Sequence, residues 1–543
     1  MKTPRRSRWT VVLGLAMGLW GPACHKVDRS RPPPVDLPEH YAGPTGQAEP
    51  AAAPDRWWAE LGSPPLDDLV QEVLDDNLQM HQAWARLEQA MAAHRIARAA
   101  FFPSVRVEAG ANTSRQNFNF GDDFQSDIPM VPGLPSFEFP ENAVISGYPL
   151  NLAASYEVDL WGRVRNANKA AIEDVAGQRD QVEAQAITLV GEVADAWFQL
   201  LEARQRKAVL KAQLQVSEDY LELVEFRYKR GLAQPSAIYQ QRSQIASQRR
   251  VLPSVKLQEQ LQENRLALLL GRPPAASIHP ERVELPEPTP LPEVGPPADL
   301  LHRRPDVRAA FRAVLAADYR VGVAIAERFP QLSLSASTGF QGRNNGLFSN
   351  WIYTLSANLV APLFEGGRRK AEVARTRAVL EERVAAYGQA VLRAIGEVED
   401  ALAQVHAQHE VIAQLEAERL ANRASLESAQ SDFLAGKVDY LSVLTAITAL
   451  QAVQLEQVSA RGQAIAARVR LHRALGGSWT QQLDAPDELT QGGLPADGSF
   501  RPGKGPKPKS TRRQKQSQPQ PNNEPRTKSS APASAPTPQE NGP

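Results

Sequence analysis

A stretch of 69 residues without a proline, from Gly162 to Arg230, is the strongest constraint on how this 543-residue chain folds. As a single α-helix it would be about 100 Å long, because an α-helix rises roughly 1.5 Å per residue. Helices in globular domains average about 11 to 12 residues. Apolar residues in the stretch recur at spacings of three, four and seven, which indicates a helix buried along a seam. Such a rod needs neighbours along its whole length.

An internal duplication supplies a second rod. The stretch 368–435 is again free of proline, and three glycine landmarks recur at a constant offset of 205 residues (162 to 367, 231 to 436 and 271 to 476). Phe102-Pro103 recurs as Phe329-Pro330 at an offset of 227, so the extra 22 residues lie between Phe102 and Gly162. The chain therefore holds two repeats, predicted at 65–270 and 299–485, with long helices at 162–230 and 367–435.

Two stretches of alternating apolar and polar residues precede each rod, and this period of two indicates β-strands. A segment rich in Asn, Asp, Phe, Pro and Gly, 113–149, is predicted as a long loop between the first two strands. Strands of about 10 residues with one apolar face suit an outer-membrane barrel. A soluble two-sheet sandwich has the same alternation, but it does not explain helices of about 100 Å attached to each hairpin. The predicted strands are 104–113, 150–160, 331–340 and 351–361.

Four strands cannot close into a barrel, because a sheet that spans a bilayer has no free edge and the smallest such barrels have about eight strands. Two copies would give eight strands and three would give twelve, and only the larger barrel leaves an obvious aqueous lumen. The predicted fold is therefore mixed, with an all-α part of long antiparallel helices and a β-barrel to which each chain contributes four transmembrane strands.

Shorter helices return the chain from the far ends of the rods. Two of them stacked end to end match the length of one rod, so we expect turns near Gly231 and Gly436. Arg304-Pro305-Asp306 is interpreted as a structural helix start, because proline suits the first turn. The proline-rich linker 271–298 would lie outside the helical cylinder as an equatorial belt. The predicted shorter helices are 65–100, 235–270, 299–328 and 438–475.

The N-terminal residues 1–23 have the basic start, apolar run and small residues of a signal peptide. Cys24, the only cysteine, lies where a bacterial lipobox is acylated, so we predict lipidation there and an extended segment over 24–64. Lipoboxes usually have leucine where this chain has Gly21, and simple cleavage with an unmodified cysteine is the alternative. Arg5-Arg6 matches a twin-arginine export signal poorly.

The C-terminal tail 486–543 is poor in apolar residues and is predicted to be disordered. Between Arg501 and Lys528 it holds nine basic residues and one acidic residue. This composition suits either electrostatic contact with an anionic surface, such as cell wall, lipopolysaccharide or a partner, or a solvated appendage.

Composition and motifs exclude several functions. The net charge of zero and the aromatic content of 6% give no bias toward nucleic acid. No apolar run reaches the roughly 20 residues of a membrane-spanning helix. No phosphate-binding or nucleophile motif has a supporting context, so we predict no catalytic residue, no cofactor and no enzyme activity. His406 and His409 lie three apart on a helix, but no carboxylate or thiolate set accompanies them, and we predict no metal site.

Three motifs carry a family resemblance: YEVDLWGR at 156–163, LHRRPDVRAA at 301–310, and GVA at 322–324 before Phe329-Pro330. With them, residues 55–485 resemble the TolC-like outer-membrane factors, most closely the NodT-type lipoprotein channels of RND efflux systems. The resemblance implies a homotrimer with a 12-stranded outer-membrane barrel and a periplasmic α-barrel of twelve helices. It also implies two partners, a periplasmic adaptor (membrane fusion) protein and an inner-membrane RND transporter that supplies the energy.

The family's periplasmic gate lies at the turns that end the rods, which here are FLAGKVDYL at 433–441 and RGLAQPS at 230–236. Relatives often place an aspartate four residues beyond the matched leucine, and this chain has Thr445 there. We therefore predict constriction by a ring of Leu441, which resists wetting, rather than by a carboxylate ring. The predicted gate residues are Gly231, Ser236, Gly436, Asp439, Tyr440, Leu441 and Thr445.

Glu157 and Asp159 alternate with the apolar face of the second strand. They are predicted to line the lumen and favour cations, or, as the alternative, to be solvated and to cap the helix that follows. The function predicted for the whole chain is a passive exit duct for drugs or other small toxic solutes. A type I protein secretion duct and a structural coiled-coil envelope protein are the other hypotheses.

Overall fold

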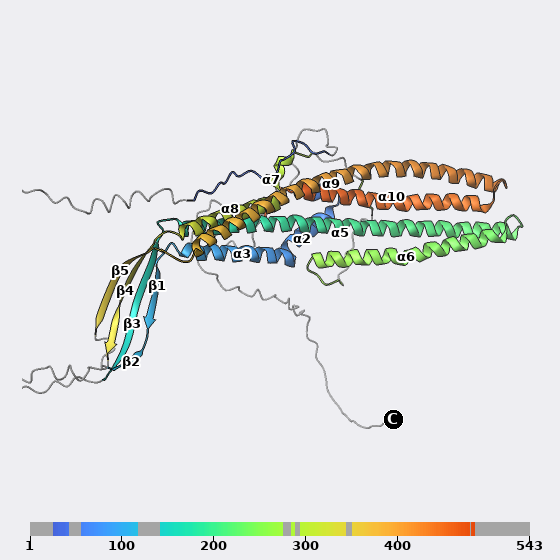
Figure 1. The fold of residues 1–543 in the computed structure, drawn as a ribbon. Helices are drawn as coiled ribbons and strands as arrows, with labels where there is room; N and C mark the ends of the chain where they lie inside the picture. Colours follow the sequence, from blue (N-terminus) through green and yellow to red (C-terminus); the bar gives the residue numbers. More distant parts are fainter. Residues whose placement is uncertain are drawn as a thin grey trace, which may run out of the picture. The chain divides into compact units, whose positions relative to one another are not determined.

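The computed structural model describes residues 25–42, 56–117, 142–274, 284–287, 294–343, 350–477 and 479–483. The chain divides into two units, 1–484 and 485–543, and every described residue belongs to the first. The predicted signal peptide, Cys24 and the predicted tail lie outside the described residues. The described part consists of long helices and one β-sheet (Figure 1).

Two helices of 67 residues each dominate the structure, α5 (Arg163–Lys229) and α9 (Arg368–Leu434). Each is one residue shorter at both ends than the rod that the sequence predicts. A glycine at positive φ precedes each helix, Gly162 at 79° and Gly367 at 85°. The antiparallel helices α6 (Pro235–Leu269) and α10 (Tyr440–Leu475) follow them and pack along them (Figure 1).

Shorter helices precede the strands of each repeat, and both are broken where we predicted one continuous helix. The first is α2 (Pro64–Asp76) followed by α3 (Leu78–Ala99), and the second is α7 (Leu300–Arg303) followed by α8 (Pro305–Ala326). Pro305 ends α7 because proline disfavours helical geometry at the residue before it. Asn77 breaks the first pair, since its backbone is extended and its side chain caps α3 by accepting from the amides of Gln79 and Met80.

The sheet contains β1 (Ser104–Ala109), β2 (Asn112–Asn117), β3 (Asn142–Val158), β4 (Gln331–Arg343) and β5 (Trp351–Val360). The antiparallel order is β1-β3-β4-β5, and β2 pairs with β3 beyond the end of β1. β1 and β2 share one register on β3 and are interrupted at Gly110, opposite Pro149, which has no backbone N–H to donate.

The predicted long loop was therefore wrong at both ends, because residues 113–117 belong to β2 and residues 142–149 to β3. The strand pairing continues past the predicted end of the first strand through the polar residues of β2, where no apolar alternation marks a strand. In the second repeat, β4 extends three residues beyond its predicted end.

The strand register gathers the apolar side chains on one face. Val105 lies opposite Ala154, which lies opposite Ala336, which in turn lies opposite Leu355. The other face carries small and polar residues such as Ser155, Ser335 and Ser356 in matching positions. Leu355 is 83% exposed, so the apolar face is open in the single chain.

Helix α8 links the two repeats, because it packs along both α5 and α9. Arg308 donates to Asp180 at 2.9 Å, and Arg312 donates to Glu173 at 3.0 Å. Val314 of α8 joins a core cluster with Val398 of α9 and Leu471 of α10. None of the helices in the described ranges is long and apolar enough to cross a membrane.

The described part of the N-terminal segment, residues 25–42, lies on this helical core. The His25 ring is 2.5 Å from an Asp318 carboxylate oxygen of α8, and Tyr41 is buried in the core cluster. Further along, Trp57–Leu61 form a short 3-10 helix, which the predicted extended segment did not include. It forms because Trp57 stacks on His472 and Trp58 packs edge-on against Trp479.

We predict that Asn77→Ala lowers the thermal stability of the protein. Asn77 is 4% exposed, caps α3, and donates its amide to the carbonyl of Leu269 at 2.6 Å. Loss of a cap and a buried hydrogen bond should destabilise the fold by about 1 to 3 kcal/mol. Thermal unfolding followed by circular dichroism measures this. Asn77→Ser keeps a neutral cap acceptor and should give a smaller shift, and an unchanged midpoint for Asn77→Ala would contradict the prediction.

Candidate functional site

The turns at the sheet-distant ends of the helices have the same backbone geometry in both repeats. The amide of Leu232 donates to the carbonyl of Arg227 at 2.9 Å, and that of Lys437 donates to the carbonyl of Asp432 at 2.9 Å. With a glycine at positive φ before each donor, these bonds form the Schellman motif that ends a helix. The two predicted gate glycines, Gly231 and Gly436, therefore have the same structural role.

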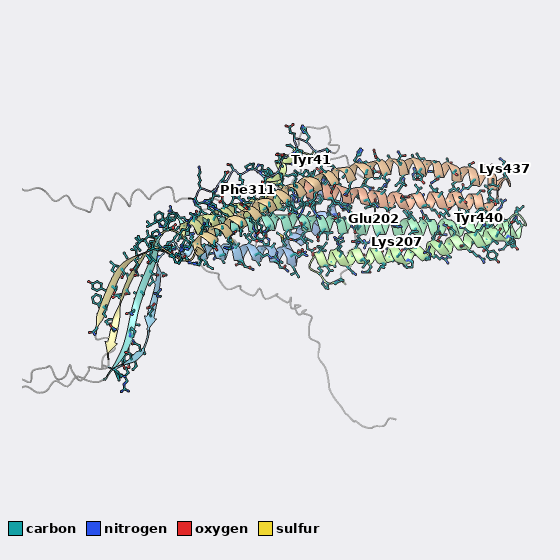
Figure 2. The ribbon with its side chains drawn as sticks, in the orientation of Figure 1. Tyr41, Glu202, Lys207, Phe311, Lys437 and Tyr440 are labelled. Carbon is teal, nitrogen blue, oxygen red and sulfur yellow. The ribbon has the colours of Figure 1, made fainter. Side chains whose placement is uncertain are left out.

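A shared apolar cluster packs the two turns together. Tyr440 is 4% exposed, and its ring meets the ring of Phe433 at a centroid distance of 5.6 Å. The guanidinium of Arg227 lies over the Phe433 ring at 4.5 Å. Figure 2 shows Tyr440 and Lys437 at the ends of the helices that are distant from the sheet. The buried members come from α5, α6, α9 and α10 and are Val224, Ala237, Phe433, Tyr440, Val443 and Ile447.

Buried amides continue from this cluster along the helices. The Tyr440 hydroxyl donates to Gln241 Oε1 at 2.7 Å, and Gln241 Nε2 donates to the carbonyl of Ser217 at 2.5 Å. Burial raises the pKa of Tyr440, so its hydroxyl stays a donor at physiological pH. Gln248 Nε2 donates to Gln451 Oε1 at 2.8 Å, which joins α6 to α10.

These glutamines are not among the residues predicted from the sequence. Gln241 and Gln248 are seven residues apart and occupy the same buried face of α6 as Ala237 and Ile245. Polar residues at seam positions of a long helix were the available signal.

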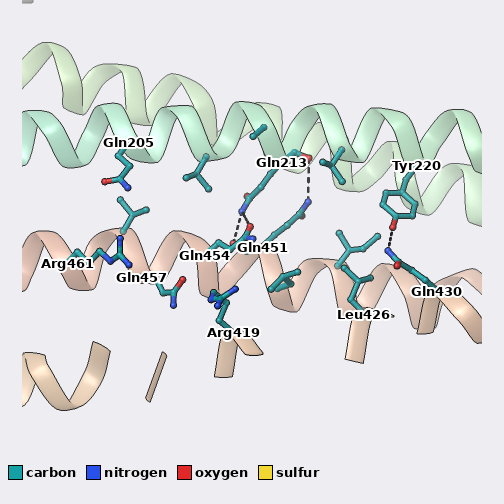
Figure 3. A pocket seen from close by; sticks show the side chains of 16 residues that line it. Gln205, Gln213, Tyr220, Arg419, Leu426, Gln430, Gln451, Gln454, Gln457 and Arg461 are labelled. Carbon is teal, nitrogen blue, oxygen red and sulfur yellow. Dashed lines mark hydrogen bonds between the residues drawn. The ribbon is translucent and has the colours of Figure 1, made fainter. Parts of the chain in front are cut away.

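A groove of ≈ 600 Å³ lies between α5, α9 and α10 beside this network (Figure 3). Gln213 crosses it and donates to the carbonyl of Gln451 and to Gln454 Oε1, both at 3.0 Å. Nearer the turns, Gln430 of α9 donates to the hydroxyl of Tyr220 of α5. These bonds tie the long helix of one repeat to the hairpin of the other.

The remaining predicted gate residues are exposed at the same end. Leu441 is 49% exposed, and Ser236 and Thr445 are also exposed. Thr445 donates its hydroxyl to the carbonyl of Leu441 at 2.8 Å, within its own helix. Asp439 caps α10 by accepting from the amide of Ser442 at 3.3 Å. The structure thus brings all seven predicted residues to one end, with Tyr440 buried as a packing residue.

Glu157 and Asp159 lie at the opposite end of α5, where the sheet meets the helices. Asp159 accepts from the backbone amides of Val164 and Arg165 at 3.2 and 2.9 Å, so it caps α5. Glu157 pairs with Arg163 through two bonds of 2.8 and 2.6 Å. The register places Glu157 opposite Ser333, on the polar face of the sheet. The capping role holds for Asp159, and the lumen role of both residues stays a prediction.

A sequence profile of the outer membrane efflux protein family matches residues 69–272 and 297–477. This chain belongs to the outer membrane efflux protein family. The gap in the match, 273–296, falls inside the linker predicted between the repeats. Among relatives, the pyoverdine export outer membrane protein OpmQ of Pseudomonas aeruginosa is 34% identical over 436 residues, 78% of this chain and 87% of that protein.

Other family members resemble the chain over similar lengths. The toluene efflux pump outer membrane protein TtgF of Pseudomonas putida is 29% identical over 445 residues, 79% of this chain and 87% of that protein. The solved structure of the outer membrane protein VceC from Vibrio cholerae is 27% identical, with a TM-score of 0.69 over 78% of this chain and 99% of that one. The chain is thus an outer-membrane efflux protein with the fold of this family.

We predict that Tyr440→Phe lowers the thermal unfolding midpoint of this efflux protein. The change removes one hydroxyl and leaves the Gln241 side-chain oxygen buried without that donor. An unpartnered buried acceptor destabilises a fold by about 1 to 3 kcal/mol. Circular dichroism of the purified protein measures the shift. Tyr239→Phe, at a tyrosine of α6 that is 69% exposed at the same end of the helices, is the matched control. Equal midpoints for the two variants would refute the prediction.

Proposed function

We propose that three copies of this efflux protein form a passive exit duct through the outer membrane. The observation that carries the proposal is the sheet, whose apolar face is exposed while β1 and β5 are its edges within the described residues. A sheet with one apolar face and free edges needs closure in a bilayer. Three copies give a closed 12-stranded barrel, wide enough for an aqueous lumen.

The polar face of the sheet then lines the lumen of the barrel. Serines are the commonest residues on this face, which also carries Arg106 and Glu108 of β1, and Glu157 is the carboxylate that ends it near the helices. The Glu157 side chain is paired with Arg163, so its charge is partly neutralised there. A lumen of small hydroxyl side chains suits passive transfer of varied solutes, with a modest preference for cations near Glu157 and Asp159.

The packed turns at the other end form the gate of the proposed duct. Val224 and Ala237 of the first repeat pack with Phe433 and Tyr440 of the second, and this cluster holds the two turns of each copy together. Leu441 is the exposed apolar side chain beside them. A ring of three Leu441 side chains around a three-fold axis would resist wetting. Thr445 occupies the position where relatives often have a carboxylate, and its hydroxyl donates to the Leu441 carbonyl. The proposed gate therefore carries no carboxylate at this position.

The partners follow from the family. A duct without an energy source needs an inner-membrane transporter and a periplasmic adaptor, and we propose an RND-type pump for that place. The two relatives named above export pyoverdine and toluene, which are small molecules, and this supports small toxic solutes over a type I protein secretion substrate.

The N-terminus provides a second attachment to the membrane. We propose that Cys24 is acylated, directly before His25, which contacts Asp318 of α8. Residues 25–42 would then run from the bilayer surface along the helical core to Tyr41.

Leu441→Ala tests the gate. Without the apolar ring, purified protein in planar bilayers should show a higher basal conductance than the wild type, because a wider and more polar constriction wets more readily. Leu420→Ala, at another exposed leucine of the second repeat, is the control and should conduct like the wild type. Wild-type conductance for Leu441→Ala would remove Leu441 from the gate, and no conductance from any variant would contradict the duct.

Cys24→Ser tests the lipid anchor. Cells grown with labelled palmitate should incorporate label into the wild-type protein and none into the variant. An unlabelled wild-type protein would show that Cys24 is not acylated.

A further inference from the structure

An aromatic pair joins the two repeats where the sheet meets the helices. Trp161 follows β3, and Phe329 precedes β4, the strand that pairs with β3. Their rings stack at a centroid distance of 4.8 Å and an interplanar angle of 24°. Trp161 Nε1 also donates to the carbonyl of Pro330 at 2.6 Å. The pair therefore joins the end of β3 in the first repeat to the start of β4 in the second.

Apolar residues flank the outer strands of the sheet in related places, although the residue 205 positions after Trp161 is Gly366. Phe102-Pro103 precedes β1 as Phe329-Pro330 precedes β4, and Leu363-Phe364 follow β5 and precede the second long helix. Phe102 is 62% exposed, Phe364 is 91% exposed and Leu363 is 96% exposed. Within one chain, these apolar side chains are left exposed.

Strand directions show where the missing contact would form. Each strand is antiparallel to its neighbour, so β1 and β5, at opposite edges, run in opposite directions. If β5 of one copy pairs with β1 of the next, the pairing is antiparallel, as it is between β3 and β4. The end of β5 and the start of β1, both at the helical end of the sheet, then become neighbours.

The helices above the sheet give independent support. Helix α8 packs along the long helices of both repeats, whereas α3, its counterpart, packs along α5 and makes no comparable contact with α9 in the described part of the chain. Ile96, near the end of α3, is 75% exposed. A neighbouring copy would offer its α9 to α3, as α5 is offered to α8 within the chain.

We propose that Phe364 of one copy stacks on Phe102 of the next copy, and that this intersubunit aromatic pair fixes each seam of the assembly. The inference rests on the proposed closed trimer and names the residues that complete it. Leu363 packs beside the pair, next to Ile96. The occupant is a second copy rather than lipid, because Glu365, Arg368 and Arg369 follow directly and carry charge at this level.

Photocross-linking tests the pair in the full-length protein. With p-benzoylphenylalanine at position 364, irradiation should give a dimer-sized band on a denaturing gel, and mass spectrometry should map the adduct to the peptide that contains Phe102. The same residue at position 161 is the matched control. It should cross-link to the Phe329 peptide within one chain and leave the band at monomer size.

Two results would distinguish failure of the aromatic pair from failure of the proposed duct. Trimers in light scattering with an adduct at any other peptide, or with lipid, would overturn the aromatic pair and leave the trimeric duct standing. Absence of trimers for the wild-type protein in detergent would refute both.

The aromatic contact also predicts coupled mutational effects. Phe102→Ala and Phe364→Ala should each lower the temperature at which trimers dissociate, and the double variant should lose little more than either single variant. Leu257→Ala, at an exposed leucine of α6, is the control and should leave that temperature unchanged. Additive losses in the double variant would show that the two rings do not meet.

Discussion

A helix of 67 residues has to be covered along its whole length, and the rest of the structure meets that requirement. Helix α5 is covered by α3 and α8 near the sheet and by α6 and α10 further out. The cover is mixed in chemistry. Near the sheet it includes ion pairs such as Arg308 with Asp180, and further out it includes amides such as Gln213 with Gln451. The helices gain stability from tertiary packing, because the local propensity of an isolated helix is marginal in water.

Periodic patterns made the large elements predictable. Freedom from proline located both long helices to within one residue at each end, and alternation found the four strand positions. The sequence allowed two interpretations of Asp159, a cap of α5 or a residue of the lumen, because an acidic residue before a helix fits both equally well. The predictions that were wrong depended on single side chains and their tertiary contacts. Asn77 breaks a helix because its amide reaches Leu269, and Pro149 interrupts β1 and β2 from the opposite strand.

The buried glutamines and the proposed intersubunit aromatic pair were not predicted from the sequence, for different reasons. Glutamine is common on exposed helical faces, so the seam spacing of Gln241 and Gln248 was easily overlooked until packing placed them inside. Phe364 lies in a short segment without apolar periodicity, and its proposed contact is made with a neighbouring copy. The clue was the stacking of Trp161 on Phe329 within the chain, since apolar residues in related places beside the outer strands are left exposed.

The equal lengths of α5 and α9 also limit how the chain can change. One inserted residue would turn every later side chain of a helix by about 100° and advance it by about 1.5 Å. The amides and apolar residues beyond the insertion would leave their partners, and one turn would protrude past the other. Length changes within the helices are therefore tolerable only when α5 and α9 change by the same number of residues. Segments outside the helices can change length freely. The offset of 205 residues between the glycine landmarks fits this restriction, and the 22 extra residues lie before the first long helix, where no helical register is disturbed.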